Sequence, residues 1–202
     1  MGGTAEKIIN AAIPLFADQG YAGVSVRAIT KAAGVENVGA VSYYFGGKRE
    51  LYLTILQEHF KGIQNLAKNI PQPSATPLEQ LEFIVHAIHM TYQRSPYMIK
   101  LLFNEFRASS EFFPEIRENI AGMQRIPREI IQKGIDEGLF RPNLNPDSLT
   151  LMFYSIAHFV YLMPAFSAGL LSEGEEGYEY YFAQTMKCFF RGILVVPEED
   201  GK

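Results

Sequence analysis

The sequence lacks most features that would indicate a secreted protein, a membrane protein or an enzyme. Its 202 residues include one cysteine, Cys188, so no internal disulfide can form, which agrees with a reducing compartment. No apolar run reaches about 18 residues, so we expect a soluble, cytoplasmic protein with no membrane partner. Because there is no nucleophile–base pair, phosphate-binding loop or Cys/His ligand pattern, we expect no enzymatic activity, no metal site and no cofactor.

The sequence also lacks strand-like alternation and internal repeats. Hydrophobic residues make up 48% of the chain, which is sufficient for a real core. They recur at helical spacing between Gly, Pro and capping signals, so the sequence predicts an all-α fold of about nine helices. We place these helices at residues 4–19, 25–33, 38–45, 48–69, 76–94, 95–108, 114–138, 145–163 (with a kink at Pro164) and 172–192.

The N-terminal residues 1–61 are nearly neutral, and residues 62–202 are acidic. The net charge is −4, which argues against a generic nucleic-acid binder. Residues 1–61 carry six basic and five acidic side chains, and residues 62–202 carry twelve and seventeen. Four of the six N-terminal basic side chains lie in residues 27–49. This is a local cluster that could face phosphates, while the acidic remainder would discourage binding elsewhere.

Two short predicted helices around a tight turn lie inside that basic cluster. Ser25 can cap the first helix, and Gly34 suits the positive φ that closes it. Asn37 is a candidate cap for the second helix, residues 38–45, which the glycines at 46–47 end. This is the pattern of a helix-turn-helix, whose second helix places its N-terminal residues on base edges in the major groove.

Residues 4–54 resemble the DNA-binding domain of TetR-family transcriptional regulators. The resemblance covers about a quarter of the chain and consists of several ordered segments. They are Phe16-Ala17-Asp18-Gln19-Gly20-Tyr21, Ser25-Val26-Arg27-Ala28-Ile29, Ala32-Ala33-Gly34-Val35 and Tyr44-Phe45-Gly46-Gly47-Lys48-Arg49-Glu50-Leu51. It implies a three-helix helix-turn-helix domain at 1–50 and a helical-bundle domain at 51–202 that binds an effector and dimerises.

The resemblance also implies which residues contact a double-stranded DNA operator. The implied contacts are Ser25, Arg27, Val38, Gly39, Ala40, Ser42, Tyr43, Tyr44 and Lys48. Hydroxyl and ammonium groups can donate to phosphates, whereas the methyl groups of Val38 and Ala40 can only contact apolar base groups such as that of thymine. Core packing is the alternative for Tyr43 and Tyr44.

The sequence departs from the family pattern at two places within this motif. One extra residue, at Glu36 or Asn37, separates the turn from the Tyr-Phe pair, and Ser42 stands where the family usually has an aromatic residue. The extra residue predicts a shifted entry of the recognition helix.

The C-terminal region is dense in aromatic and sulfur-containing residues, and the resemblance implies an effector site among its helices. We expect a small apolar or aromatic effector in a pocket formed by His89, Tyr92, Phe103, Phe106, Tyr154 and His158. For any single member of this set, plain core packing is the alternative. A metal site from His86, His89, His158 and Glu105 is disfavoured, because no dense ligand motif accompanies them.

The predicted helices at 145–163 and 172–192, the eighth and ninth, are apolar on more than one face and need cover on all sides. A second copy would supply it, which predicts a homodimer through a four-helix bundle and a near-palindromic operator. The sequence therefore predicts a dimeric DNA-binding regulator, most simply a repressor released by its effector. The alternatives are a helical small-molecule-binding protein or enzyme, and a helical adaptor without DNA binding.

Overall fold

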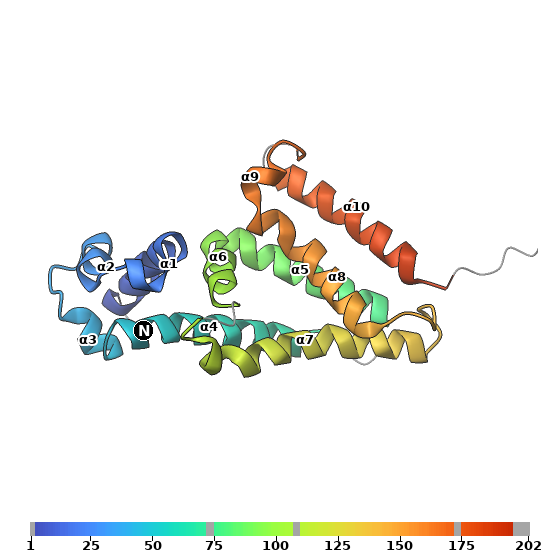
Figure 1. The fold of residues 1–202 in the computed structure, drawn as a ribbon, viewed down its shortest axis with the longest axis horizontal. Coiled ribbons are helices and arrows are strands. Elements are labelled where there is room, and N and C mark those ends of the chain that lie inside the picture. Colours follow the sequence, from blue (N-terminus) through green and yellow to red (C-terminus); the bar gives the residue numbers. More distant parts are fainter. Residues whose placement is uncertain (1–2, 72–74, 107–109, 172–174, 196–202) are drawn as a thin grey trace, which may run out of the picture. The chain divides into compact units, whose positions relative to one another are not determined.

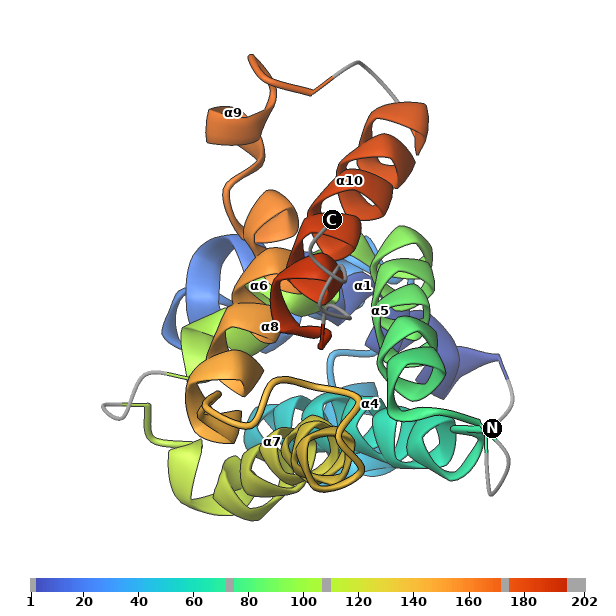
Figure 2. The same cartoon turned by 90° about the vertical axis from the view of Figure 1, so that its right-hand side faces the viewer.

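The computed structural model describes residues 3–71, 75–106, 110–171 and 175–195, and this part of the chain is all-α with ten helices. The chain divides into two compact units (Figures 1 and 2). Residues 1–66 and 91–120 form what we call the head unit, and residues 67–90 and 121–202 form the body unit. The all-α prediction is therefore confirmed.

The head unit contains α1 (Thr4–Gly23), α2 (Val26–Ala32), α3 (Ala40–Phe45), α6 (Pro96–Glu105) and most of α4 (Lys48–Lys68). Its core includes Ile8, Phe16, Ile29 and Leu51, all fully buried. α6 packs directly on α1, on the side away from α3 (Figure 1). Gly20, the predicted end of the first helix, has φ +69° and breaks the regular helical backbone within α1.

The body unit contains α8 (Pro146–Leu162), α9 (Pro164–Ser167) and α10 (Glu175–Ile193), with most of α5 (Pro77–Arg94) and α7 (Phe113–Asp136). Its core is built from large apolar side chains. The fully buried ones are Leu81, Ile131, Phe140 and Phe153, and Phe189 is nearly so. α10 packs along α8 (Figure 2).

Three helix starts follow capping signals read from the sequence. The Ser25 hydroxyl accepts from Ala28 N at 3.1 Å, and Asn145 Oδ1 accepts from Ser148 N at 2.8 Å. Thr76 and Glu79 form a reciprocal capping box, in which Thr76 N donates to Glu79 Oε2 at 2.7 Å and Glu79 N donates to Thr76 Oγ1 at 3.3 Å. The capping box predicted from Ser172 lies outside the described residues.

Two predicted helices differ from the structure. Pro164 does not kink a longer helix but begins the separate α9, because Met163, with φ −123° and ψ 55°, leaves the helical conformation. The recognition helix α3 begins at Ala40, two residues later than predicted. Asn37 Oδ1 accepts from Gly39 N at 2.8 Å and closes a turn ahead of the helix.

The predicted domain boundary after residue 50 lies within α4 and follows chain order, whereas the compact units are discontinuous along the chain. That boundary remains a prediction about function. The helix-turn-helix segment shares its unit with α6 and with the first residues of α7, which identifies the elements that hold it in place. Within the described ranges, no helix has both the length and the apolar character needed to cross a membrane.

Candidate DNA-binding and effector-binding sites

The recognition helix α3 presents a polar and aromatic surface to solvent. Ser42, Tyr43 and Tyr44 are exposed, and Tyr43, at 83%, is the most exposed of the large hydrophobic side chains described in the head unit. Val38 and Gly39 are exposed in the turn before it. The rings of the two tyrosines meet edge to face, with centroids 4.9 Å apart. Core packing, the alternative considered for Tyr43, is therefore wrong.

The opposite side of α3 is directed into the head unit. Val41 is fully buried and Ala40 is only 6% exposed. The Ala40 methyl is consequently not available for the thymine contact predicted from the sequence, because a short helix must bury one face against its own domain. α3 ends at Gly46, whose φ of +89° is left-handed, and Gly47 leads directly into α4.

Lys48 anchors the start of α4 to the last turn of α1 and to Val24, the residue that follows it. Its ammonium donates to the carbonyl oxygens of Tyr21 and Val24, both at 2.9 Å, and lies 4.1 Å from the centroid of the Tyr21 ring. These contacts fix the end of α1 relative to the residues that follow α3. An ammonium has three protons, so one remains for a further acceptor such as a phosphate.

Ser25 and Arg27 lie at the start of α2 and are both exposed. The Ser25 hydroxyl oxygen is used as the helix cap, which leaves its proton free to donate. The Arg27 carbonyl accepts from the Thr30 hydroxyl at 3.3 Å, while the Arg27 guanidinium forms none of the ion pairs found among the described residues. Both side chains can therefore reach an external anion.

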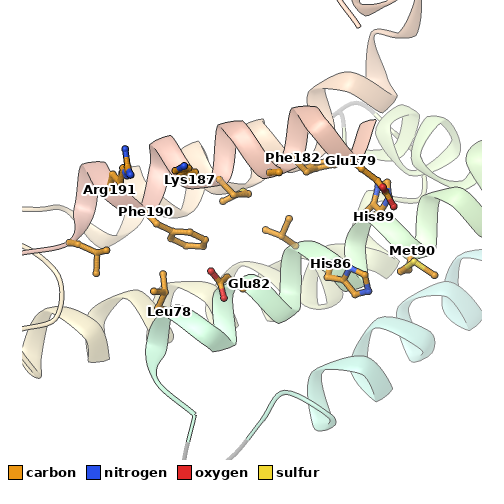
Figure 3. Close-up of a pocket in the computed structure, with 14 residues that line it drawn as sticks. Leu78, Glu82, His86, His89, Met90, Glu179, Phe182, Lys187, Phe190 and Arg191 are labelled. Carbon is orange, nitrogen blue, oxygen red and sulfur yellow. The ribbon is translucent and has the colours of Figure 1, made fainter. Parts of the chain in front are cut away.

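The body unit contains a groove between α5 and α10 with a volume of about 500 Å³ (Figure 3). Apolar side chains from both helices line most of it, and charged ones stand among them. The lining residues are Leu78, Glu82, Val85, His86, His89, Met90, Glu179, Phe182, Ala183, Met186, Lys187, Phe190, Arg191 and Leu194. In Figure 3, Phe190 extends from α10 toward α5, while Arg191 projects away from the groove. Its volume suits a small organic molecule.

An aromatic cluster surrounds His89 and Phe182, two of the residues that line this groove. His89 is buried on α5, and its Nδ1 lies 2.5 Å from the Tyr161 hydroxyl. The His89 ring meets Phe182 edge to face at 5.1 Å, and Tyr161 stacks on Tyr178 at 5.3 Å. Burial raises the pKa of Tyr161, with the neighbouring Tyr178 adding to the effect, so its hydroxyl stays protonated.

Of the six predicted effector residues, the structure places only His89 in the groove. Tyr154 and His158 lie on α8 of the same unit but bond to backbone: the Tyr154 hydroxyl donates to Met123 O at 2.7 Å, and His158 Nδ1 lies 3.0 Å from Tyr154 O. Burial lowers the pKa of His158 to about 4, so it is neutral near pH 7.

The other three predicted effector residues belong to the head unit. Tyr92 is buried, Phe106 is half-buried, and Phe103 is 47% exposed. The sequence prediction missed most of the groove, including Leu78, Val85 and the α10 wall. A signal was present, since Met186, Phe190 and Leu194 recur every fourth residue along α10, but the same spacing also describes an ordinary core face.

The described ranges hold no group of three or more His, Cys, Asp or Glu side chains that could bind a metal ion. His86 and His89 line the groove, but Glu105 lies in the head unit and accepts from Tyr52. The four residues of the disfavoured metal site are thus divided between the two units.

A separate surface of the body unit is apolar and exposed. It consists of large side chains on α8, α9 and the residues that follow them: Leu151, Met152, Phe159, Met163, Phe166 and Leu170. The Phe159 and Phe166 rings meet edge to face at 5.8 Å. Exposed apolar residues gathered on one face are typical of a surface that another protein covers.

Residues 8–55 match the family described as bacterial regulatory proteins, tetR family, and residues 77–171 match the tetracyclin repressor-like C-terminal domain. The chain is 31% identical over 200 residues to the probable HTH-type transcriptional regulator YttP of Bacillus subtilis (strain 168), covering 95% of this chain and 94% of YttP. The chain belongs to the TetR family.

This TetR-family protein is therefore a helix-turn-helix, DNA-binding transcriptional regulator, and its family is not one of enzymes. It is 25% identical over 160 residues to the HTH-type transcriptional repressor NicS of Pseudomonas putida, covering 77% of this chain and 74% of NicS. The KstR and KstR2 relatives are also named repressors.

Solved structures share the whole fold of this TetR-family chain. The ketosteroid transcriptional regulator KstR2 of Mycobacterium tuberculosis superposes with a TM-score of 0.81 at 20% identity, covering 97% of both chains. FadR from Bacillus subtilis in complex with stearoyl-CoA superposes with a TM-score of 0.73 at 19% identity, covering 93% of this chain and 98% of FadR. At such identities the likeness concerns the fold alone.

Proposed function

We propose that this TetR-family protein is a homodimeric repressor that binds a near-palindromic operator and is released by a small apolar or aromatic effector. The observation that carries the proposal is the exposed face of α3, where Tyr43 and its neighbours stand free on a helix whose other side is buried. A helix held in this way can enter the major groove with its N-terminal residues on base edges.

In this proposal, the head unit contacts DNA in two ways. Ser25, Arg27, Tyr44 and Lys48 donate to phosphates and position the head, because hydroxyl, guanidinium and ammonium groups can all bond phosphate oxygens. The exposed turn and helix face of Val38, Gly39, Ser42 and Tyr43 lie along the bases. Few of these groups can read base edges by hydrogen bonding, so specificity rests on Ser42 and Tyr43 together with close backbone approach at Gly39.

Dimerisation in this proposal uses the exposed apolar face of α8 and α9 together with α10. Burying Leu151, Phe159 and Met163 against the same residues of a second copy removes apolar surface from water on both sides. Two heads then reach two half-sites about one helical turn apart, which is why the operator should be near-palindromic.

The effector in this proposal occupies the groove between α5 and α10 and contacts His89. The apolar lining of the groove supports a ligand that is largely apolar, and the aromatic contact between the lining residues His89 and Phe182 supports contact with a ring or chain. Two structural relatives, a ketosteroid regulator and a regulator in complex with stearoyl-CoA, have names or ligands with a large apolar part, which supports a mainly apolar effector here. The effector can release DNA only as far as it binds the two conformations of the protein with different affinities.

The test is selection of DNA fragments by the purified full-length protein at one fixed salt concentration. We expect enrichment of a palindromic sequence by the wild type and none by a Ser42→Ala, Tyr43→Ala variant. Small apolar molecules are then screened for release of the selected site, with Ala183→Trp, which fills the groove, as the matched variant. A folded dimer that enriches no sequence would point instead to an adaptor or a small-molecule carrier.

A further inference from the structure

A buried carboxylate lies at the C-terminal end of α6. Glu105 is 5% exposed, and no basic side chain pairs with it in the part of the chain that the structure describes. A buried charge is costly unless hydrogen bonds replace the lost water. The groups that bond to Glu105 therefore show what the carboxylate holds in place.

Two hydroxyl groups donate to this carboxylate from different parts of the chain. The Tyr52 hydroxyl, from α4, donates to Oε1 at 2.5 Å, and the Ser110 hydroxyl donates to Oε2. Ser110 Oγ also accepts from Phe112 N at 3.1 Å, at the start of α7. Glu105 thus joins the end of α6 to α4 and to the first residues of α7, all within the head unit.

Tyr52 and the neighbouring Phe112 pack directly on α1, the helix whose Tyr21 holds Lys48. The Tyr52 ring meets Phe16 edge to face at 4.8 Å and lies 5.2 Å from Tyr21. Phe112 lies 4.6 Å from Tyr52 and 4.7 Å from Tyr21. Tyr21 is the residue whose carbonyl and ring hold Lys48, directly after α3.

Glu105 is the last residue of α6, which begins at Pro96, one residue after α5 ends at Arg94. Burial and the hydrogen bond to Glu105 both raise the pKa of Tyr52, so its hydroxyl remains a proton donor at neutral pH.

We propose that Glu105 is a positioning residue for DNA binding, which fixes the end of α6 to Tyr52 on α4 and to Ser110 before α7 and so sets the placement of the recognition helix. The proposal rests on the proposed DNA-binding function. It assigns Glu105 no contact with DNA or effector. Its effect passes through Tyr52 and the aromatic contacts with Tyr21.

The first test measures backbone amide exchange of the full-length protein without DNA, and so does not depend on the operator. Tyr52→Phe removes one of the two hydroxyl groups that donate to Glu105, and Glu105→Ala removes both carboxylate oxygens that accept from them. We expect each change to speed exchange at least threefold in residues 40–52. Glu58→Gln on the exposed side of α4 and Tyr97→Phe on α6 are the matched controls and should leave these rates unchanged.

The second test measures operator affinity as the separation of the two half-sites is changed one base pair at a time. We expect Tyr52→Phe and Glu105→Ala to reduce the preference for the best spacing at least threefold, with the salt dependence of binding unchanged because phosphate contacts are retained. Glu105→Gln keeps an acceptor for Tyr52 and should restore the wild-type profile. A general loss of stability would not alter spacing preference in the folded fraction.

The two tests separate failure of this inference from failure of the proposed function. A wild-type protein that selects no operator contradicts the proposed function, while amide exchange still decides whether Glu105 holds α3. Wild-type exchange rates in Tyr52→Phe would overturn the role of Glu105, as would a wild-type spacing profile in that variant. If Glu105→Ala does not fold, Tyr52→Phe decides the outcome alone.

Discussion

Inside the head unit and inside the body unit, different kinds of contact stand out. In the head, single polar groups fix backbone positions, as Lys48 does with two carbonyl oxygens and Glu105 does with two hydroxyls. In the body, the stacked rings of Tyr161 and Tyr178 pack beside Phe182, which lines the groove. Hydrogen bonds require one geometry, because they weaken steeply when misaligned. Apolar packing can rearrange with a small loss of stability. The difference suits a head that must match DNA and a body that must accept a ligand.

The exposed surfaces of the two units also differ, since one is polar and the other apolar. The head exposes hydroxyl-bearing Ser42 and Tyr43 on α3, and the body exposes Phe159 and its apolar neighbours on α8. The first surface suits phosphates and base edges, and the second suits another copy of the chain.

The largest expected effect comes from placing a charge on the apolar face of the body. Phe159→Glu should convert the dimer to a monomer and weaken operator binding by about a thousandfold, because a second tethered head no longer adds its contacts. Sedimentation measures the mass, and fluorescence anisotropy measures the affinity. Tyr97→Glu, at a similarly exposed ring on α6, is the control. A dimer of wild-type affinity in Phe159→Glu would rule out this interface.

The next effect is acid destabilisation, with one histidine in each unit. Burial lowers the pKa of His59 in the head and of His158 in the body to about 4, below the usual value near 6.5. The unfolded chain takes up these protons first, so stability is complete above about pH 6.5 and falls as the pH drops toward 4. Each histidine contributes up to about 3 kcal/mol of this loss.

Urea unfolding of the wild type, His59→Gln and His158→Gln at pH 4.5 and 7.5 measures this effect. Each variant should lose less stability between the two pH values than the wild type does. Equal losses in all three proteins would show that neither histidine is the acid-sensitive group.

Lys48→Ala tests the anchor in the head. The substitution removes two charge-assisted hydrogen bonds to Tyr21 and Val24, so we expect unfolding to become easier by about 2 kcal/mol. Operator affinity should fall at least tenfold, and the salt dependence should weaken by about one charge if Lys48 also contacts a phosphate. Lys61→Ala, elsewhere on α4, is the control. Unchanged affinity across a salt titration would exclude the DNA-binding role of Lys48.

Gly134→Ala tests packing in the body alone. A Cβ at Gly134 would lie 2.3 Å from the fully buried Phe140 ring, so the helix or the ring must move. We expect a loss of about 1–2 kcal/mol in stability with operator affinity retained. On the same helix, Gly122→Ala meets no atom within 4 Å and should stabilise by a few tenths of a kcal/mol or more. Equal stabilisation by both changes would contradict this packing.

Tyr43→Phe is expected to have the smallest effect. Because the ring is 83% exposed, losing its hydroxyl should not change stability, but operator affinity should fall several-fold if the hydroxyl donates to DNA. Tyr97→Phe is the control for affinity. An unchanged affinity would leave Tyr43 with at most a ring contact.

The sequence alone predicted the head much better than the body. The helix-turn-helix depends on local signals, and Ser25 and Gly34 act within a few residues of their place in the chain. The groove and the hydrogen bonds of Glu105 depend instead on packing between segments that are distant in sequence. Tyr52 and Glu105, for example, are 53 residues apart. Local sequence patterns do not indicate which helices pack against each other. Of the predicted effector residues, His89 alone lines the groove for this reason.

The start of α3 marks the limit of local prediction within the head. Asn37 and the short helix were both expected, but the Asn37 side chain bonds Gly39 N and delays the helix to Ala40. Ala40 opens the helix on its buried side next to Val41, while Ser42 and Tyr43 are exposed.

The most direct test of the account is a hydroxyl-radical footprint of the full-length protein on its selected operator. We expect two protected regions on one face of the DNA, about one helical turn apart and related by two-fold symmetry. Inserting about half a helical turn, roughly 5 base pairs, between them should abolish tight binding. A single asymmetric footprint, or binding that is indifferent to the insertion, would contradict a dimer that reads two half-sites with paired recognition helices.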